Sequence, residues 1–347
     1  VIWKQLLFFF FFFFFVSFFQ QLYNTVDTII VGQTVGTSAL AAVGSTGNLT
    51  NLIINFYVGL STGASVVIAQ YYGAQNNKKI HQAVHTSYSL SIVSGILMML
   101  FGLFFSYQCL DAIGTPHDIL NDATLYMQLY FLCMIPGAIY NIGAGILRAV
   151  GDSKRPLYYL IICSIVNVVF DFIFVVIFHQ GIAGAAIATV IAQSVCAILV
   201  TIQLMRTNEV YKLTLSKMKF HLPVLKKIIM IGAPAGIQST MYSISNIVLQ
   251  SHINAFGTRT IASWSVYVKI DALFWMMIAA IGAAITTFAG QNYGAHLHDR
   301  IKKGARTALA MAFIMTISIS TILCLTGSYI TRLFSSDPHI IEECYSL

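Results

Sequence analysis

The sequence predicts an all-α polytopic membrane protein, and two observations lead to this fold class. Hydrophobic residues make up 57% of the 347 residues, charged residues only 9%, and the mean hydropathy is +0.78. A water-soluble chain of this length needs more charge on its surface. Apolar stretches of about 20 residues recur along the chain without an alternation of period two, so they predict membrane-spanning helices and not membrane β-strands.

Nine segments are long and apolar enough to be spanning helices. Glycine lies at the connections between them, as expected at helix ends. Pro136 is expected to bend the fourth span and Pro234 to kink the seventh. Small residues in GLSTGAS (59–65) and GIAGAAIAT (181–189) predict close approach of two helices. In chain order the predicted spans are 6–31, 46–71, 87–109, 121–147, 157–178, 183–205, 228–252, 262–288 and 306–332.

Lysine and arginine gather at the N-terminus and in every second connection, which together hold sixteen of the 19 basic residues. The positive-inside rule therefore predicts a plasma (inner) membrane protein whose N-terminus is cytoplasmic. The longest connection, about 206–227 with six basic residues, is interpreted as a solvated cytoplasmic linker. The net charge of +7 is attributed to loops near an anionic leaflet, and no nucleic-acid partner is expected.

A constant shift along the sequence aligns the two halves of the chain and predicts an internal duplication. Six spans separate the copies, an even number, so the two bundles form a parallel repeat. The predicted domains are an N-terminal six-helix bundle (1–206), the basic linker (207–227) and a C-terminal bundle (228–347) with three helices and the start of a fourth. By this measure the second bundle is incomplete, and a full repeat would have twelve helices. The shift places Gln70, Tyr72, Gly73 and Ala74 on Gln291, Tyr293, Gly294 and Ala295.

Two carboxylates, Asp27 and Asp171, lie in segments that hydrocarbon should surround. An ionisable side chain in a membrane costs about 2.5–3.5 kcal/mol on insertion scales, so it normally faces a polar cavity and serves an ion, proton or substrate path. Asn167 lies one turn before Asp171 on the same helix face, while Tyr126 and Thr189 lie at a similar depth in other spans. These oxygen groups suit Na⁺, with Asp27, Asn167, Asp171 and Thr189 as ligands, whereas two nearby carboxyls can instead share a proton. The residues leave the choice of ion open.

A second polar pair, Lys269 and Asp271, lies near the middle of the eighth predicted span. Residues two apart on a helix do not face each other. A polar site in the second bundle and structural pairing with other helices are therefore alternative interpretations. No HExxH motif is present, so an intramembrane enzyme is not expected, and no cofactor is expected beyond the coupling ion.

Several motifs together resemble the multidrug and toxic compound extrusion (MATE) family of cation-coupled antiporters, in its prokaryotic branch related to DNA-damage-inducible protein F. They are FFQQLYNTVDTIIVG, QYYGA, LRAVGDSKRP, NVVFD, IGAPAGIQS and FAGQNYGA, and they cover nearly the whole chain.

The resemblance implies two six-helix bundles arranged as a V around a central cavity. It also implies a cation or proton site in the first bundle, and Asp27, Asn167, Asp171, Thr189 and Tyr126 match the positions of that site. The family usually has a proline in its first helix, but this chain has eight consecutive phenylalanines, Phe8 to Phe15. The seventh span lacks the acidic residue of other branches, which favours coupling in the first bundle.

The expected function is secondary active antiport that exports amphipathic or cationic drugs in exchange for Na⁺ or H⁺. The expected partners are small substrates and the lipid bilayer, and the chain is expected to be a monomer. A lipid-linked precursor flippase of the same superfamily and an inactive truncated transporter are the alternatives.

Overall fold

The computed structural model describes the chain except residues 1, 36, 116, 255–257 and 333–347. The described residues are almost entirely helical and include no β-strand, which confirms the all-α fold class. A π-helix, η1 (Phe172–Ile177), follows the sixth helix, and a short 3₁₀ helix, η2 (Leu215–Lys217), precedes the eighth. The α-helices are α1 (Ile2–Thr34), α2 (Thr37–Gly73), α3 (Asn77–Ala112), α4 (His117–Phe131), α5 (Met134–Ala149), α6 (Lys154–Asp171), α7 (Gly181–Arg206), α8 (Leu222–Asn254), α9 (Thr258–Gly294) and α10 (His298–Arg332).

Eight of the nine predicted spans meet a length and hydropathy requirement for crossing a membrane, within the described residues. One of the eight is a broken span, in which α4 and α5 meet at an angle of 44°. Pro136 lies in the first turn of α5, where its ring cannot accommodate the carbonyl of Leu132, so the predicted bend is confirmed. The predicted span that does not meet the requirement is 228–252, which corresponds to α8. This helix is 33 residues long but contains a polar stretch at 238–246, which lowers its mean hydropathy.

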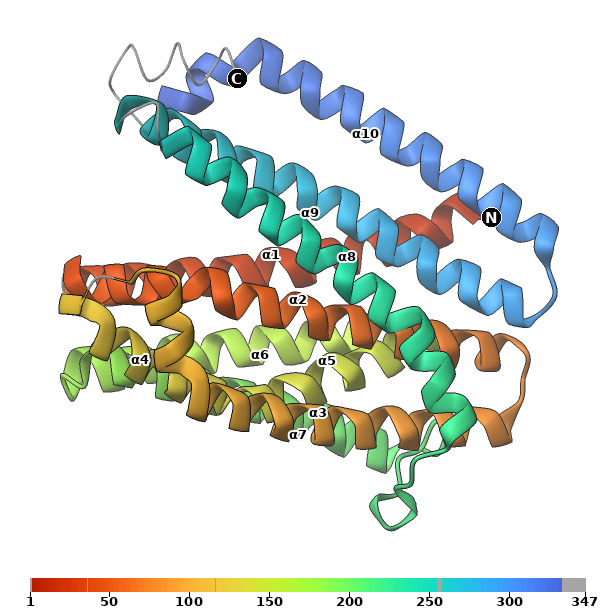
Figure 1. The fold of residues 1–347 in the computed structure, drawn as a ribbon. Helices are drawn as coiled ribbons and strands as arrows, with labels where there is room; N and C mark the ends of the chain where they lie inside the picture. The colour runs from red at the N-terminus through yellow and green to blue at the C-terminus, as the bar shows by residue number, and fades with distance from the viewer. Residues whose placement is uncertain (1, 36, 116, 255–257, 333–347) are drawn as a thin grey trace.

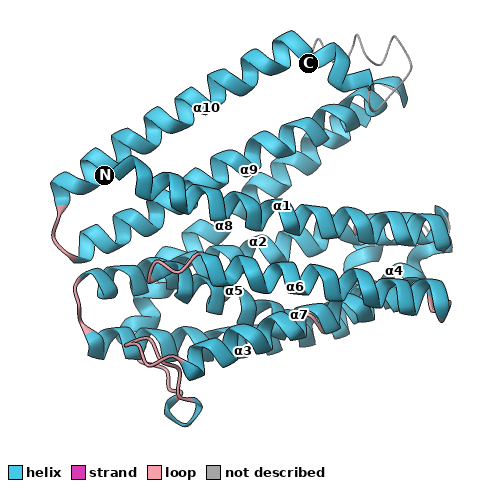
Figure 2. Cartoon of the chain, turned by 180° about the vertical axis from the view of Figure 1, so that it is seen from behind, coloured by secondary structure: helices cyan, strands magenta, loops and turns pink. Residues whose placement is uncertain are grey.

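The helices form two groups, α1 to α7 and α8 to α10 (Figure 1). The groups lie closest at one end of the molecule and diverge toward the other, and the view from behind in Figure 2 shows the same arrangement. We call the end at which the two groups lie closest the basic end. It carries the connections 74–76, 150–153, 207–221 and 295–297.

The helix bounds reproduce the predicted repeat. The shift that aligns the two halves of the sequence places both ends of α2 on the corresponding ends of α9, and the start of α3 on the start of α10. Across the two groups, α1 packs against α9 and α2 packs against α8. In the repeat α1 is equivalent to α8, and α2 is equivalent to α9. Each helix of one copy therefore packs against the same partner of the other copy, as expected for two parallel copies related by a twofold pseudo-axis.

Glycine allows α2 and α8 to approach closely, as the GLSTGAS segment predicts. A Cβ atom at Gly59 would lie 2.2 Å from the backbone nitrogen of Gly236, and one at Gly63 would lie 2.5 Å from the carbonyl oxygen of Ile228. Both distances are shorter than van der Waals contact, so a larger residue at either position would force the helices apart.

The phenylalanine run of α1 faces two environments. Phe13 is buried against Ala280 and Ala284 of α9. Phe8 and Phe11 are exposed, Phe11 to 53%. The run therefore contributes to the contact between the two helix groups, and it also exposes aromatic rings on the outer surface of α1. Through this run α1 continues as one helix without proline.

Residues 206–221 are mostly exposed or half-buried, as expected of a solvated loop, but two side chains also anchor this connection in the core. Leu213 is only 1% exposed and, with Tyr211, joins the core formed by α2, α3, α5 and α7. These two apolar side chains give the connection a buried anchor that its high positive charge concealed. Residues 222–227, predicted as linker, already belong to α8, with Pro223 in the first turn, where its missing N–H costs nothing.

Replacing Gly59 with alanine should destabilise the protein, because the new methyl group would overlap the backbone of α8. Overpacking of this kind costs about 1–3 kcal/mol. The measurement is the melting temperature of the purified protein. Gly282→Ala is the matched control, because a Cβ at this helical glycine meets no atom within 4 Å. An equal or higher melting temperature for Gly59→Ala would contradict the close packing.

Candidate functional site

Asp171 is the last residue of α6, and the π-helix η1 begins directly after it. Asn167 lies one turn earlier on the same helix, and both side chains are buried, Asp171 completely. A π-helix adds a residue to the turn and shifts the following side chains around the axis, and such insertions are frequent at functional sites. The change of helix type therefore occurs at the acidic residue itself.

Asp27 lies on α1, which packs against α6. Its carboxyl group lies close enough to the Asp171 carboxyl for the two groups to interact electrostatically. The two carboxylates predicted from separate spans therefore meet. We call these two residues the acidic pair.

The acidic pair has no neutralising partner among the described residues. Both carboxyl oxygens of Asp171 and Oδ1 of Asp27 are buried without a hydrogen-bond donor, and so is Oδ1 of Asn167. The described residues contain one ion pair, between Asp152 in the connection after α5 and Arg155 in the first turn of α6. Buried carboxylates in this condition are strongly disfavoured unless a proton or a cation joins them.

Asn167 and Thr189 extend the oxygen-rich surface from the acidic pair to α7. The Asn167 amide nitrogen donates to Thr189 Oγ1 at 3.5 Å, and that hydroxyl donates to the carbonyl oxygen of Ala185 at 3.1 Å. This orientation leaves the Asn167 carbonyl oxygen free of donors. A hard cation that prefers oxygen ligands would fit the carboxyl, amide and hydroxyl oxygens of Asp27, Asn167, Asp171 and Thr189.

Tyr126 on α4 is also buried, and it lies close enough to both members of the acidic pair to interact electrostatically. Two tyrosines that sequence reasoning missed share this environment. Tyr130 stacks on Tyr126 with ring centroids 6.0 Å apart, and both Tyr130 and Tyr23 interact with Asp27. Both tyrosines could have been found from their spacing. Tyr23 lies four residues before Asp27, and Tyr130 four residues after Tyr126, so each pair shares one face of its helix.

The second predicted polar pair does not join the acidic pair. Asp271 lies on α9 of the second group, where Tyr267 is an electrostatic neighbour. The side chain of Lys269 lies outside the described residues. The prediction of a second polar site at Lys269 and Asp271 therefore stays a prediction.

The two helix groups meet at the basic end through a symmetric glycine crossing. A Cβ at Gly73 would lie 1.8 Å from the carbonyl oxygen of Gln291, and a Cβ at Gly294 would lie 1.8 Å from that of Gln70. These residues are equivalent in the repeat, so the pseudo-axis passes through this contact. The Gln291 side chain also donates to the carbonyl oxygen of Ala149 at 2.8 Å and thus ties α9 to α5.

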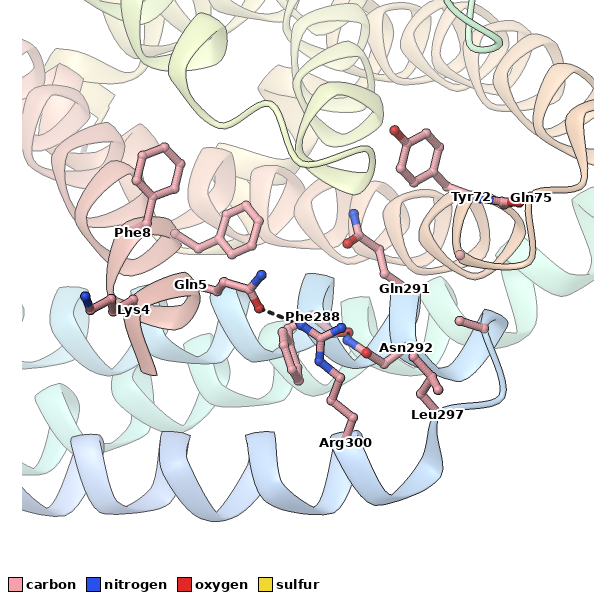
Figure 3. Close-up of a pocket in the computed structure, with 13 residues that line it drawn as sticks. Lys4, Gln5, Phe8, Tyr72, Gln75, Phe288, Gln291, Asn292, Leu297 and Arg300 are labelled. Atoms are coloured by element: carbon pink, nitrogen blue, oxygen red, sulfur yellow. Dashed lines mark hydrogen bonds between the residues drawn. The ribbon is translucent and has the colours of Figure 1, made fainter. Parts of the chain in front are cut away.

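Next to this crossing, α1, α2, α9 and α10 line a pocket of about 620 Å³ (Figure 3). Arg300 reaches from α10 toward α1, where its guanidinium donates to Gln5 Oε1 at 2.9 Å. Its guanidinium also lies 5.5 Å from the centre of the Phe288 ring. The pocket therefore lies between the two groups, on the side where they are in contact.

The fold and the acidic pair define a class of protein: a multi-pass membrane transporter built from two related helix bundles. The chain belongs to the MatE family, because a family model described as MatE matches residues 13–173 and 234–346. The shift that defines the repeat places the start of the first matched stretch on the start of the second. Members of this family are transporters and not enzymes.

Similar proteins include the probable multidrug resistance protein YoeA of Bacillus subtilis, which is 26% identical over 100% of this chain and 76% of its own length. A FAD transporter of Shewanella oneidensis is 22% identical over 92% of this chain and 72% of its own length. Among solved structures, a multidrug resistance MATE family transporter in an outward-facing conformation matches with a TM-score of 0.92 and 25% identity. The match covers 99% of this chain and 77% of that one.

Substituting leucine for Gly73 or Gly294 should separate the two groups at the basic end, because the side chain has no room against the opposing backbone. Spin labels at Gln75 and His296 occupy equivalent exposed turns on the two repeats, so their separation reports the change. We expect a longer distance in both variants than in the wild-type protein. Gly282→Leu is the control and should leave the distance unchanged. Unchanged distances in both glycine variants would refute a tight crossing.

Proposed function

We propose that this transporter is a secondary active antiporter that exports amphipathic or cationic compounds in exchange for Na⁺ or H⁺. The observation that carries the proposal is the acidic pair, two carboxyl groups that lie close together within the membrane-spanning bundle. Multidrug resistance proteins among the relatives support drug-like cargo.

We further propose that the basic end is cytoplasmic and that the protein lies in the plasma (inner) membrane. The concentration of lysine and arginine at this end supports the orientation. With this orientation, the glycine crossing closes the protein toward the cytoplasm. The likeness to a solved transporter in an outward-facing conformation supports the same assignment.

The coupling ion would be held by the chain's own oxygen atoms. Na⁺ would bind Asp27, Asn167, Asp171 and Thr189, whereas a proton would be shared by the two carboxyl groups. Either ion removes the repulsion within the acidic pair and makes burial of both carboxyls favourable. Loss of the ion favours separation or hydration of the pair.

Helix α1 connects the charge of the acidic pair to the contact between the bundles. Asp27 lies in its second half, while Phe13, near its start, packs against Ala280 and Ala284 of α9. Leu6 packs against Phe288 of α9 and Ala308 of α10. A shift of α1 relative to Asp171 would therefore change both the ion site and the inter-bundle contact. Coupling requires only that the ion bind the two arrangements with different affinity.

Asp27→Asn and Asp171→Asn should each abolish ion-coupled efflux, because the neutral amide carries no charge to bind Na⁺ and cannot take up and release a proton. The measurement is efflux of a fluorescent cationic dye from vesicles under an imposed Na⁺ or H⁺ gradient. Protein levels should be normal, because an amide replaces each carboxyl with little change in volume. Asp122→Asn is the control, since this carboxylate is exposed, and its efflux should equal that of the wild type. Coupled efflux in both test variants would refute the proposal.

The variants Asn167→Ala and Thr189→Val distinguish Na⁺ from H⁺ as the coupling ion. If Na⁺ is the ion, each variant removes a ligand oxygen and should raise the Na⁺ concentration for half-maximal efflux by about tenfold, the effect of about 1.4 kcal/mol. If a proton is the ion, efflux under a pH gradient should persist in both variants with a smaller change. The measurement is dye efflux as a function of Na⁺ concentration at constant pH. Unchanged behaviour under both gradients would exclude these two residues from the site.

A further inference from the structure

A second pocket at the basic end, on the outer side of the first bundle, is separate from the acidic pair and from the pocket between the bundles. Its volume is about 400 Å³, and it lies between the first turns of α3 and the connection before α8. Five of its lining side chains are basic or imidazole groups, Lys78, His81, Lys217, Lys219 and His221, and the other two are uncharged and polar. The pocket has no apolar wall.

The positive charges of this pocket are not neutralised by the described part of the chain. No aspartate or glutamate lines the pocket, and the ion pair of Arg155 and Asp152 does not involve it. Lys217 and His221 lie close enough to His81 to interact with it electrostatically. The N-terminus of α3 adds a partial positive charge at the same place. The folded chain thus holds like charges together at an energetic cost.

Buried hydrogen bonds, and not the charges, hold these groups in place. The backbone N–H of Thr214 donates to Nε2 of His85 at 3.0 Å, and the Nδ1 of that ring lies 2.7 Å from the carbonyl oxygen of His81. The backbone N–H of His221 donates to Thr86 Oγ1 at 3.1 Å. His85 and Thr86 are fully buried, so the connection is fixed to α3 on both sides of Lys217 and Lys219.

We propose that this pocket binds a phosphate group. Lysine binds phosphate as a point charge, and a preformed cluster of cations gains most from a compact, multiply charged anion. The phosphate can be carried by a soluble phosphorylated molecule or by the headgroup of an anionic phospholipid. Membrane orientation accounts for many lysines at this end. It does not account for their arrangement around a pocket by buried hydrogen bonds.

The test uses the full chain in phosphatidylcholine nanodiscs. In the first arm, calorimetry measures the affinity for inorganic pyrophosphate. In the second arm, the melting temperature is compared between nanodiscs with and without phosphatidylglycerol. Binding in the first arm identifies a soluble ligand, and stabilisation in the second arm alone identifies a lipid headgroup.

The double variant Lys217→Gln/Lys219→Gln should weaken pyrophosphate affinity by about tenfold or more, or abolish the stabilisation by phosphatidylglycerol. Lys212→Gln is the matched control, because this lysine is exposed on the same connection but does not line the pocket. Thr86→Val leaves every charge in place but removes the bond to His221, and it should also weaken binding. No response of the wild-type protein in either arm, or an equal loss in Lys212→Gln and the double variant, would overturn the proposal.

Discussion

Two carboxyl groups that lie close together inside a helical bundle cannot both remain ionised unless a cation binds them, and otherwise one of them takes up a proton. Asp27 and Asp171 meet this condition, because they come from different helices, and both oxygens of Asp171 and Oδ1 of Asp27 have no donor among the described residues. The other features of the site follow from this constraint. Asn167 and Thr189 supply further oxygens on the neighbouring helix faces, and α1 carries one half of the pair into the contact with the second bundle.

The two bundles are held together by close backbone contacts as well as by apolar side chains such as Leu6 and Phe13. Gly59 and Gly63 let α2 lie against α8, and Gly73 with Gly294 forms the crossing at the basic end. Because the repeat relates Gly73 to Gly294, the contact is symmetric about the pseudo-axis. A contact of this kind has a short range, so a small displacement of one helix is enough to break it. The alternation between two openings that antiport requires is compatible with such an interface.

Much of the architecture was predictable from the sequence, because each predicted span corresponds to a helical region and the internal repeat appears in the helix bounds. The rarity of carboxylates in apolar segments pointed to Asp27 and Asp171, which lie close together in the structure. The π-helix after Asp171 was not predictable, since nothing in FIFVVI distinguishes it from an α-helical turn. The packing of the basic connection was missed for another reason. Two of its side chains, Tyr211 and Leu213, are buried in the core, but the mean hydropathy of this charged segment does not reveal them.

The most direct test of the account is an infrared titration of the purified protein, since protonated and ionised carboxyl groups absorb at different frequencies. The account predicts a protonated carboxyl band that disappears when the pH or the Na⁺ concentration is raised, and that is absent from the Asp27→Asn/Asp171→Asn double variant. A band that responds to neither pH nor Na⁺ in the wild-type protein, or that the double variant retains, would contradict ion binding by the acidic pair.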